Sequence, residues 1–99
     1  KNRIYIGLDK DDYGGMNPTG NIIRDAWVFG ILPEGETCAG WNYDRIQALY
    51  DQVYQAWAPY DHLVSKLPED LRKRHEAIYS AAMKRARELG WLAEYGHDD

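Results

Sequence analysis

The stretch NPTGNIIRDAWVFGIL, residues 17–32, contains the most apolar local run of the chain and decides the predicted fold. Its first four residues are a strong turn signal, because proline fixes one backbone dihedral and glycine permits a positive φ. The next twelve residues, 21–32, are rich in β-branched and aromatic side chains and predict a strand with a bulge near Arg24 and Asp25. Gly30 within this run also indicates a bulge or a close backbone approach.

Two shorter segments on either side of this run complete the predicted sheet. Residues 3–8, RIYIGL, alternate in polarity and are β-branched, which predicts a strand with Tyr5 on the side opposite to Ile4 and Ile6. Residues 37–41 follow a PEGE turn and are either a third short strand beside the second or irregular coil.

Beyond residue 41 the apolar spacing changes to that of a helix. Asn42 is the expected N-cap of a helix over residues 42–58, and Pro59 ends this helix at or before Ala58. The side chains expected on its inward face are Ile46, Leu49, Tyr50, Val53 and Trp57.

A second helix is predicted over residues 68–89, where a proline stands at the first helical position. Glu69 and Asp70 suit the positive end of its dipole. Gly90 is the expected left-handed residue after the helix, and Trp91 is expected to fold back on the last turn. The predicted inward stripe consists of Leu71, His75, Ile78, Ala82, Ala86 and Leu89.

Together these elements predict one α+β domain, in which a two- or three-stranded antiparallel sheet is covered by a C-terminal two-helix hairpin. Residues 1–41 form the strand and loop half, residues 42–90 the helical hairpin, and residues 91–99 a frayed tail. A two-stranded ribbon is marginal alone, so the helices or a second copy of the chain must cover it. A homodimer is thus one expected arrangement.

The composition limits the expected classes of function and the expected cellular compartment. The chain has 99 residues, with 16 acidic and 12 basic side chains, and a net charge of −4 disfavours nucleic-acid binding. It has no signal-peptide core and no apolar run long enough to span a bilayer. The single cysteine, Cys38, excludes an internal disulfide and is expected to be a small buried hydrophobe in a cytoplasmic protein.

The polar loop GLDKDDYGGMNPTGN resembles neither a calcium loop nor a phosphate loop. Asp9, Asp11 and Gly14 match the start of a calcium loop, but Tyr13 and Gly20 stand where oxygen ligands are required. The loop lacks the Lys-Ser/Thr pair of a phosphate loop, and a strand rather than a helix N-terminus is expected after it. Its length still makes it the first candidate site.

Two hypotheses about this loop are kept. In the first, the protein is a non-enzymatic accessory protein that binds a protein partner through the loop and exposed aromatic side chains. In the second, it is a cation- or ligand-binding module, with or without enzymatic activity, that holds calcium, magnesium or manganese, with Asn17 as a further oxygen ligand. The expected metal ligands are Asp9, Asp11 and Asp12, and the expected partner-binding residues are Asp11, Asp12, Tyr13, Asn17 and Trp41.

The four tryptophans and eight tyrosines are many for a chain of this length. Trp27, Trp57 and Trp91 are expected in the core. Exposed tyrosine and tryptophan side chains commonly anchor protein interfaces, which supports the first hypothesis. The aromatic residues hardest to bury together are Tyr13, Tyr43, Tyr60, Tyr95 and Trp41.

The remaining polar residues do not indicate catalysis. His75 lies in the apolar stripe and is expected to be a core histidine bonded to Tyr50 or Tyr54. No serine has the context of a nucleophile, and the sequence cannot place the carboxylates of Asp25 and Asp44. A solvated face is expected for the basic side chains of the second helix, Arg72, Lys73, Arg74, Lys84, Arg85 and Arg87.

Overall fold

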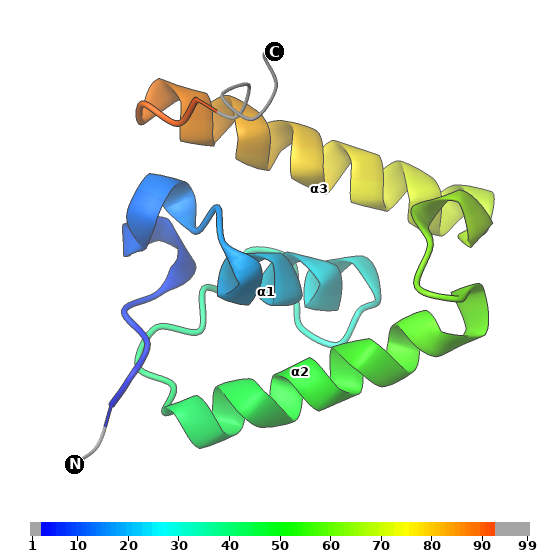
Figure 1. The fold of residues 1–99 in the computed structure, drawn as a ribbon, viewed down its shortest axis with the longest axis horizontal. Helices are drawn as coiled ribbons and strands as arrows, with labels where there is room; N and C mark the ends of the chain where they lie inside the picture. The colour runs from blue at the N-terminus through cyan, green and yellow to red at the C-terminus, as the bar shows by residue number, and fades with distance from the viewer. Residues whose placement is uncertain (1–2, 93–99) are drawn as a thin grey trace.

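The computed structural model describes residues 3–92, and these form an all-helical fold (Figure 1). The predicted α+β class is wrong, because the described residues contain no strand or sheet. The α-helices are α1 (Pro18–Val28), α2 (Tyr43–Trp57) and α3 (Glu69–Glu88). Short 3-10 turns are η1 (Leu8–Lys10), η2 (Asp12–Gly14), η3 (Ala58–Tyr60) and η4 (Val64–Lys66).

Helix α1 replaces the strand predicted over residues 21–32. Asn17 has extended backbone, and its side-chain oxygen accepts a hydrogen bond from the Gly20 N–H at 2.8 Å. Pro18 takes the first helical position, so NPTG begins a helix instead of making a turn. The strand prediction failed because the β-branched and aromatic content of residues 21–32 was given more weight than their spacing, although the buried residues Gly20, Ile23 and Arg24 recur at the helical period.

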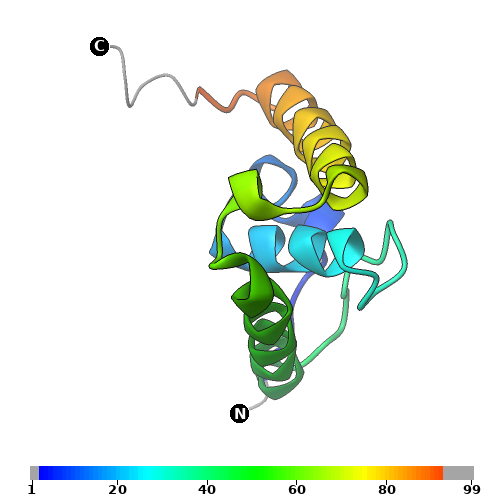
Figure 2. The same cartoon turned by 90° about the vertical axis from the view of Figure 1, so that its right-hand side faces the viewer.

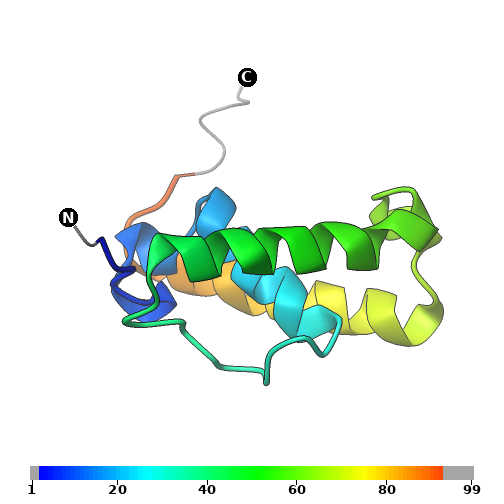
Figure 3. The same cartoon turned by 90° about the horizontal axis from the view of Figure 1, so that it is seen from below.

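The predicted hairpin of two helices does not cover a sheet. Helix α1 packs against both α2 and α3, which run in opposite directions on either side of it (Figures 1 and 2). Figure 3 shows α2 crossing in front of α1 when the molecule is seen from below. The two outer helices therefore bury the apolar surface of α1 in place of a sheet face.

The predicted N-terminal strand is an extended segment with one isolated antiparallel bridge, between Ile4 and Asn42. The Tyr5 N–H donates to the Trp41 carbonyl oxygen at 2.7 Å, and the Gly40 N–H donates to the Tyr5 carbonyl oxygen at 2.9 Å. The Leu8 N–H also donates to the Thr37 carbonyl oxygen at 3.0 Å, but these bonds do not make a continuous ladder. The predicted alternation is confirmed: Tyr5 is buried, while Ile4 and Ile6 are 61% and 57% exposed. A strand needs a paired neighbour along several residues, and here the neighbouring segment turns at once into α2.

Residues 37–41 are irregular coil, the second of the two predicted alternatives. Cys38 is fully buried there, as expected, and its backbone N–H donates to Glu36 Oε2 at 3.0 Å. Burial, with a further contribution from the Glu36 carboxylate, raises the pKa of the Cys38 thiol to about 11. This cysteine is therefore a packed side chain rather than a reactive one.

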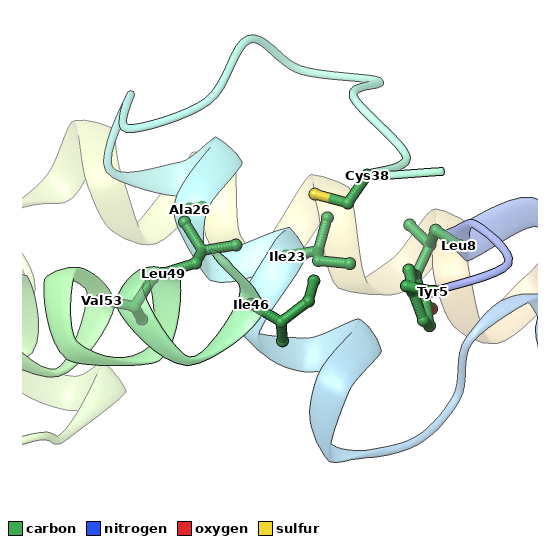
Figure 4. Close-up of a cluster of buried hydrophobic side chains, with 8 residues drawn as sticks. All are labelled: Tyr5, Leu8, Ile23, Ala26, Cys38, Ile46, Leu49 and Val53. Carbon is green, nitrogen blue, oxygen red and sulfur yellow. The ribbon is translucent and has the colours of Figure 1, made fainter. Parts of the chain in front are cut away.

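The main core joins α1 and α2 to the N-terminal segment and the coil before α2 (Figure 4). Partly buried side chains, among them Trp27 and Trp57, pack around it. Because Tyr5 and Leu8 come from the N-terminal segment and Cys38 from the coil before α2, these segments are fixed by the same apolar contacts as the helices. The clustered side chains are Tyr5, Leu8, Ile23, Ala26, Cys38, Ile46, Leu49 and Val53.

Both helices predicted in the second half of the chain are confirmed, except that Pro68 is the N-cap of α3 and Glu69 its first helical residue. Asn42 caps α2, since its side-chain oxygen accepts a hydrogen bond from the Arg45 N–H at 2.8 Å. Beyond α3, Gly90 has φ 101°, and the Trp91 N–H donates back to the Ala86 carbonyl oxygen at 2.9 Å. With the bond from the Gly90 N–H to the Arg87 carbonyl oxygen, this is a Schellman cap, as predicted.

Helix α3 keeps most of its surface in solvent. Ile78 and Ala86 from the predicted stripe are buried, whereas Leu89 is 42% exposed. Although α3 has 20 residues, no helix in the described part of the chain is both long and apolar enough to cross a bilayer. Of the predicted tail, residues 93–99 lie outside the described residues, and Tyr95 with them.

Candidate functional site

The polar loop before α1 is an ordered pair of 3-10 turns, η1 and η2, which meet at Asp11. The Asp11 carboxylate accepts hydrogen bonds from Asn17 Nδ2 at 2.9 Å and from the Tyr5 hydroxyl at 2.8 Å. Its other oxygen accepts the Asp12 backbone N–H at 2.8 Å. Burial alone would raise the pKa of Asp11, but these hydrogen bonds together hold it below its usual value.

Asn17 joins this loop to the start of α1. It donates to Asp11 through Nδ2 and caps the helix through Oδ1. The loop and the helix approach so closely that a Cβ on Gly20 would lie 1.8 Å from the Gly15 carbonyl oxygen. Asp11 and Asn17, both predicted to bind a partner or a metal, are thus engaged in holding the loop on α1.

Arg24, which the sequence placed in a bulged strand, lies beneath the loop and holds it by hydrogen bonds to its backbone. It is only 3% exposed, and its Nη2 donates to the Gly14 carbonyl oxygen at 2.6 Å. Its Nη1 donates to the Gly15 carbonyl oxygen at 3.0 Å and to Asn21 Oδ1 at 3.1 Å. A helical period would have placed Arg24 two turns after the N-cap on the loop side, so the missed helix also hid this residue.

Tyr13 lies at the outer edge of the loop, where the backbone is left-handed with φ 53°. Its side chain is 45% exposed and lies near the end of α3. It lines a depression of about 540 Å³, here called the loop hollow. The other residues that line the loop hollow are Asp9, Lys10, Asp11, Asp12 and Leu89.

Trp41 does not line the loop hollow. Its carbonyl oxygen accepts the Tyr5 N–H, and its ring lies under the Arg45 guanidinium, 3.7 Å from Cζ to the ring centroid. This cation–π contact covers part of the indole face. The structure therefore brings Asp11, Asp12 and Tyr13 to one depression and leaves Trp41 outside it.

The predicted metal ligands Asp9, Asp11 and Asp12 all line the loop hollow. Within residues 3–92, however, no group of three or more histidine, cysteine or acidic side chains is arranged to hold a metal ion. The Asp11 oxygens already accept hydrogen bonds from three donors. A helix N-terminus does follow the loop, contrary to expectation, but Asn17 occupies it as the cap.

A second depression, here called the inter-helix pocket, lies between α1, α3 and the loop and has a volume of about 300 Å³. Apolar side chains from all three elements line it, and Arg24 and Arg85 are its cationic groups. Asp9 lines both depressions. The apolar lining includes Leu8, Trp27, Ile78 and Ala82.

Asp25 forms a hydrogen-bonded junction among the three helices. Its carboxylate accepts Tyr79 Oη–H from α3 at 2.6 Å and Trp57 Nε1–H from α2 at 3.0 Å. Burial and the nearby Asp25 charge raise the pKa of the Tyr79 hydroxyl. Both carboxylate oxygens of Asp25 are therefore used to join helices, which explains this residue in an apolar run.

His75 and several basic side chains of α3 contact other parts of the protein. The His75 ring stacks on Tyr79 at a centroid distance of 4.4 Å, and within residues 3–92 it makes no hydrogen bond to Tyr50 or Tyr54, the expected partners. Arg74 donates to the Trp27 carbonyl oxygen at 2.5 Å and to the Val28 carbonyl oxygen at 3.3 Å. Exposed ion pairs engage Lys73 with Glu69, and Lys84 and Arg85 with Glu88.

The loop hollow and the inter-helix pocket both combine charged groups with apolar surface, which is the usual chemistry of a binding site. Compared with protein-family models, curated proteins and solved structures, the chain matches none. Any proposal about what these depressions bind must therefore be argued from the chemistry of the residues that line them.

Proposed function

We propose that the protein is a small non-enzymatic interaction module that binds a basic segment of a partner protein in the loop hollow. The observation that carries this proposal is the half-exposed ring of Tyr13, which shares a depression of about 540 Å³ with Asp9 and Asp12. A cytoplasmic location is part of the proposal, since the free, fully buried Cys38 suits a reducing compartment.

The lining of the loop hollow matches a lysine or arginine side chain. Three carboxylates and one ammonium group line it, so its formal charge is −2. The face of a tyrosine ring attracts a cation, and exposed carboxylates accept charge-assisted hydrogen bonds from it. Leu89, which is 42% exposed, offers apolar surface for the methylene stem of such a side chain.

The hollow is also preorganised for binding. Tyr13 keeps a left-handed backbone, a conformation that tyrosine rarely adopts. The next residue, Gly14, is held through its carbonyl oxygen by the buried Arg24. The loop is thus already ordered in the folded protein, so a partner that binds there does not have to offset the conformational entropy lost in ordering it.

A peptide-display selection against the folded protein tests the proposal, followed by titration of the selected peptides at two salt concentrations. We expect the selected sequences to share lysine or arginine and their affinity to fall at high salt. Selected peptides without a shared basic residue would refute the proposed ligand class.

Two variants locate the binding site. Tyr13→Gly removes the ring and suits the left-handed backbone, so it should leave stability unchanged or higher while abolishing peptide binding. Tyr43→Ala is the matched control, because Tyr43 is 46% exposed but lies at the start of α2. Binding that survives Tyr13→Gly, or that is lost equally in the control, would show that the loop hollow is not the site.

A further inference from the structure

The inter-helix pocket carries an inference that goes beyond the proposed function. It opens between α1 and α3, and of the residues lining the loop hollow it shares only Asp9. Its volume of about 300 Å³ lies at the small end of the range of ligand pockets. Space remains there because α3 presents small side chains, Ala81 and Ala82, after the larger Ile78.

The pocket contains a buried cation without a carboxylate partner. Arg24 is 3% exposed, and none of the ion pairs in residues 3–92 includes it. The nearest acidic residue in the sequence, Asp25, uses its carboxylate on Trp57 and Tyr79 instead. All three hydrogen-bond acceptors of the Arg24 guanidinium are neutral oxygens, and burial lowers the pKa of Arg24, although the nearby Asp25 charge partly opposes this shift.

The guanidinium of Arg24 retains donors for a ligand. Three of its N–H groups donate to the carbonyl oxygens of Gly14 and Gly15 and to Asn21. Its Nε–H and the second N–H on Nη2 have no acceptor among residues 3–92. Arg85, whose stem lies near Gly14 and whose Nη1 pairs with Glu88 Oε1 at 3.2 Å, adds a second cation to the lining.

We infer that the inter-helix pocket binds a small organic carboxylate whose apolar body packs on Trp27, Ile78 and Ala82 and whose carboxylate pairs with Arg24 and Arg85. Arginine is suited to this role because its planar N–H groups match the two oxygens of a carboxylate. The single carboxylate in the lining, Asp9, leaves a net positive charge of one.

A titration followed by backbone amide NMR tests this inference, with phenylacetate as the probe. Phenylacetate should shift the amides of residues around the pocket and bind about tenfold more tightly than the uncharged phenylacetamide. Acetate, which lacks the apolar body, and phenethylamine, which reverses the charge, should both bind more weakly still. Equal binding of the amide and the carboxylate would overturn the ion-pair assignment.

Variants on α3 test the location of the site without disturbing Arg24, which holds the loop. Ala82→Leu should fill the pocket and abolish the shifts, whereas Ala77→Leu makes the same change at an exposed position of the same helix. Arg85→Gln should weaken phenylacetate binding several-fold, and Lys84→Gln should not, although both residues pair with Glu88.

The expected pattern separates this site from the loop hollow. Ala82→Leu should leave capture of basic peptides unchanged, and Tyr13→Gly should leave phenylacetate binding unchanged. Absence of shifts with phenylacetate in the millimolar range, or shifts that persist in Ala82→Leu, would overturn the inference while leaving the proposed function untouched.

Discussion

Helices α1 and α3 are stabilised in opposite ways. The 11 residues of α1 are enclosed by other elements, and the carbonyl oxygens near its end are bonded by Arg74 from α3. The 20 residues of α3 have acidic residues in the first turn, basic residues in the last turn and a Schellman cap of their own. Tertiary contacts thus maintain α1, whereas local interactions contribute much to α3.

This difference explains why one helix could be predicted and the other could not. A helix with an exposed face shows its period in the sequence, as α3 does through Ile78 and Ala86. In α1 the buried positions include Ile23, Arg24 and Ala26, and partly buried residues lie between them. The buried positions of α1 also recur at helical spacing, but its β-branched and aromatic side chains suit a strand as well, so the two interpretations competed.

The comparison predicts that equal truncations cost more in α1 than in α3. Ile23 is fully buried and Ile78 is 7% exposed. Ile23→Ala should reduce the free energy of unfolding by about 3–5 kcal/mol, and Ile78→Ala by about 2–3 kcal/mol. Chemical denaturation measures both, and an equal or larger loss at Ile78 would contradict the assignment of α1 to the centre.

Gly20 tests whether α1 depends on its contact with the loop. In an ordinary helix, alanine is more favourable than glycine, but here the new Cβ would meet the Gly15 carbonyl oxygen. Gly20→Ala should therefore destabilise the protein by about 3 kcal/mol, measured as a fall in the denaturation midpoint. Ala77→Gly, the reverse change on exposed α3, should cost only about 1 kcal/mol.

Gly90 tests the local stabilisation of α3. Its φ of 101° is unfavourable for a residue with a Cβ, although no severe clash surrounds the site. Gly90→Ala should cost about 1 kcal/mol, and the loss should appear first as fraying of the last turn in hydrogen exchange. A stabilising effect would show that the Schellman cap does not form.

The smallest expected effect is the contribution of Asp11 to the loss of folding stability at acidic pH. Because its pKa is lower in the folded than in the unfolded protein, the unfolded state binds more protons in this range, and stability falls as pH decreases. The contribution of Asp11 is present above the usual value of 3.8 and is lost progressively below it. Asp11→Asn should flatten the stability profile below about pH 4, by less than about 1 kcal/mol, because the carboxylate is partly solvated.

The candidate site was only partly predictable. The length and composition of the loop made it the first candidate, and Tyr13 lines a depression there, but its role as a binding site stays a prediction. The bonds that join Asp11 and Asn17 could not be predicted, because they require the Asn17 cap and therefore helix α1. Trp41 was grouped with the loop on aromatic character alone, and sequence gives no distance between segments so far apart.

The sequence by itself determined α2 and α3, with Asn42 as a cap and Gly90 as a left-handed terminator, because these signals act within one turn of the chain. It also determined which side chains are apolar enough to form a core. The Asn17 cap and Pro18 are local signals of the same kind and were present in the sequence for α1 too, so only the burial of Arg24 beneath the loop was decided by the tertiary structure alone. The physical reason is that a buried arginine needs acceptors from outside its own helix, here the carbonyl oxygens of Gly14 and Gly15, and packing rather than local propensity brings them beside it.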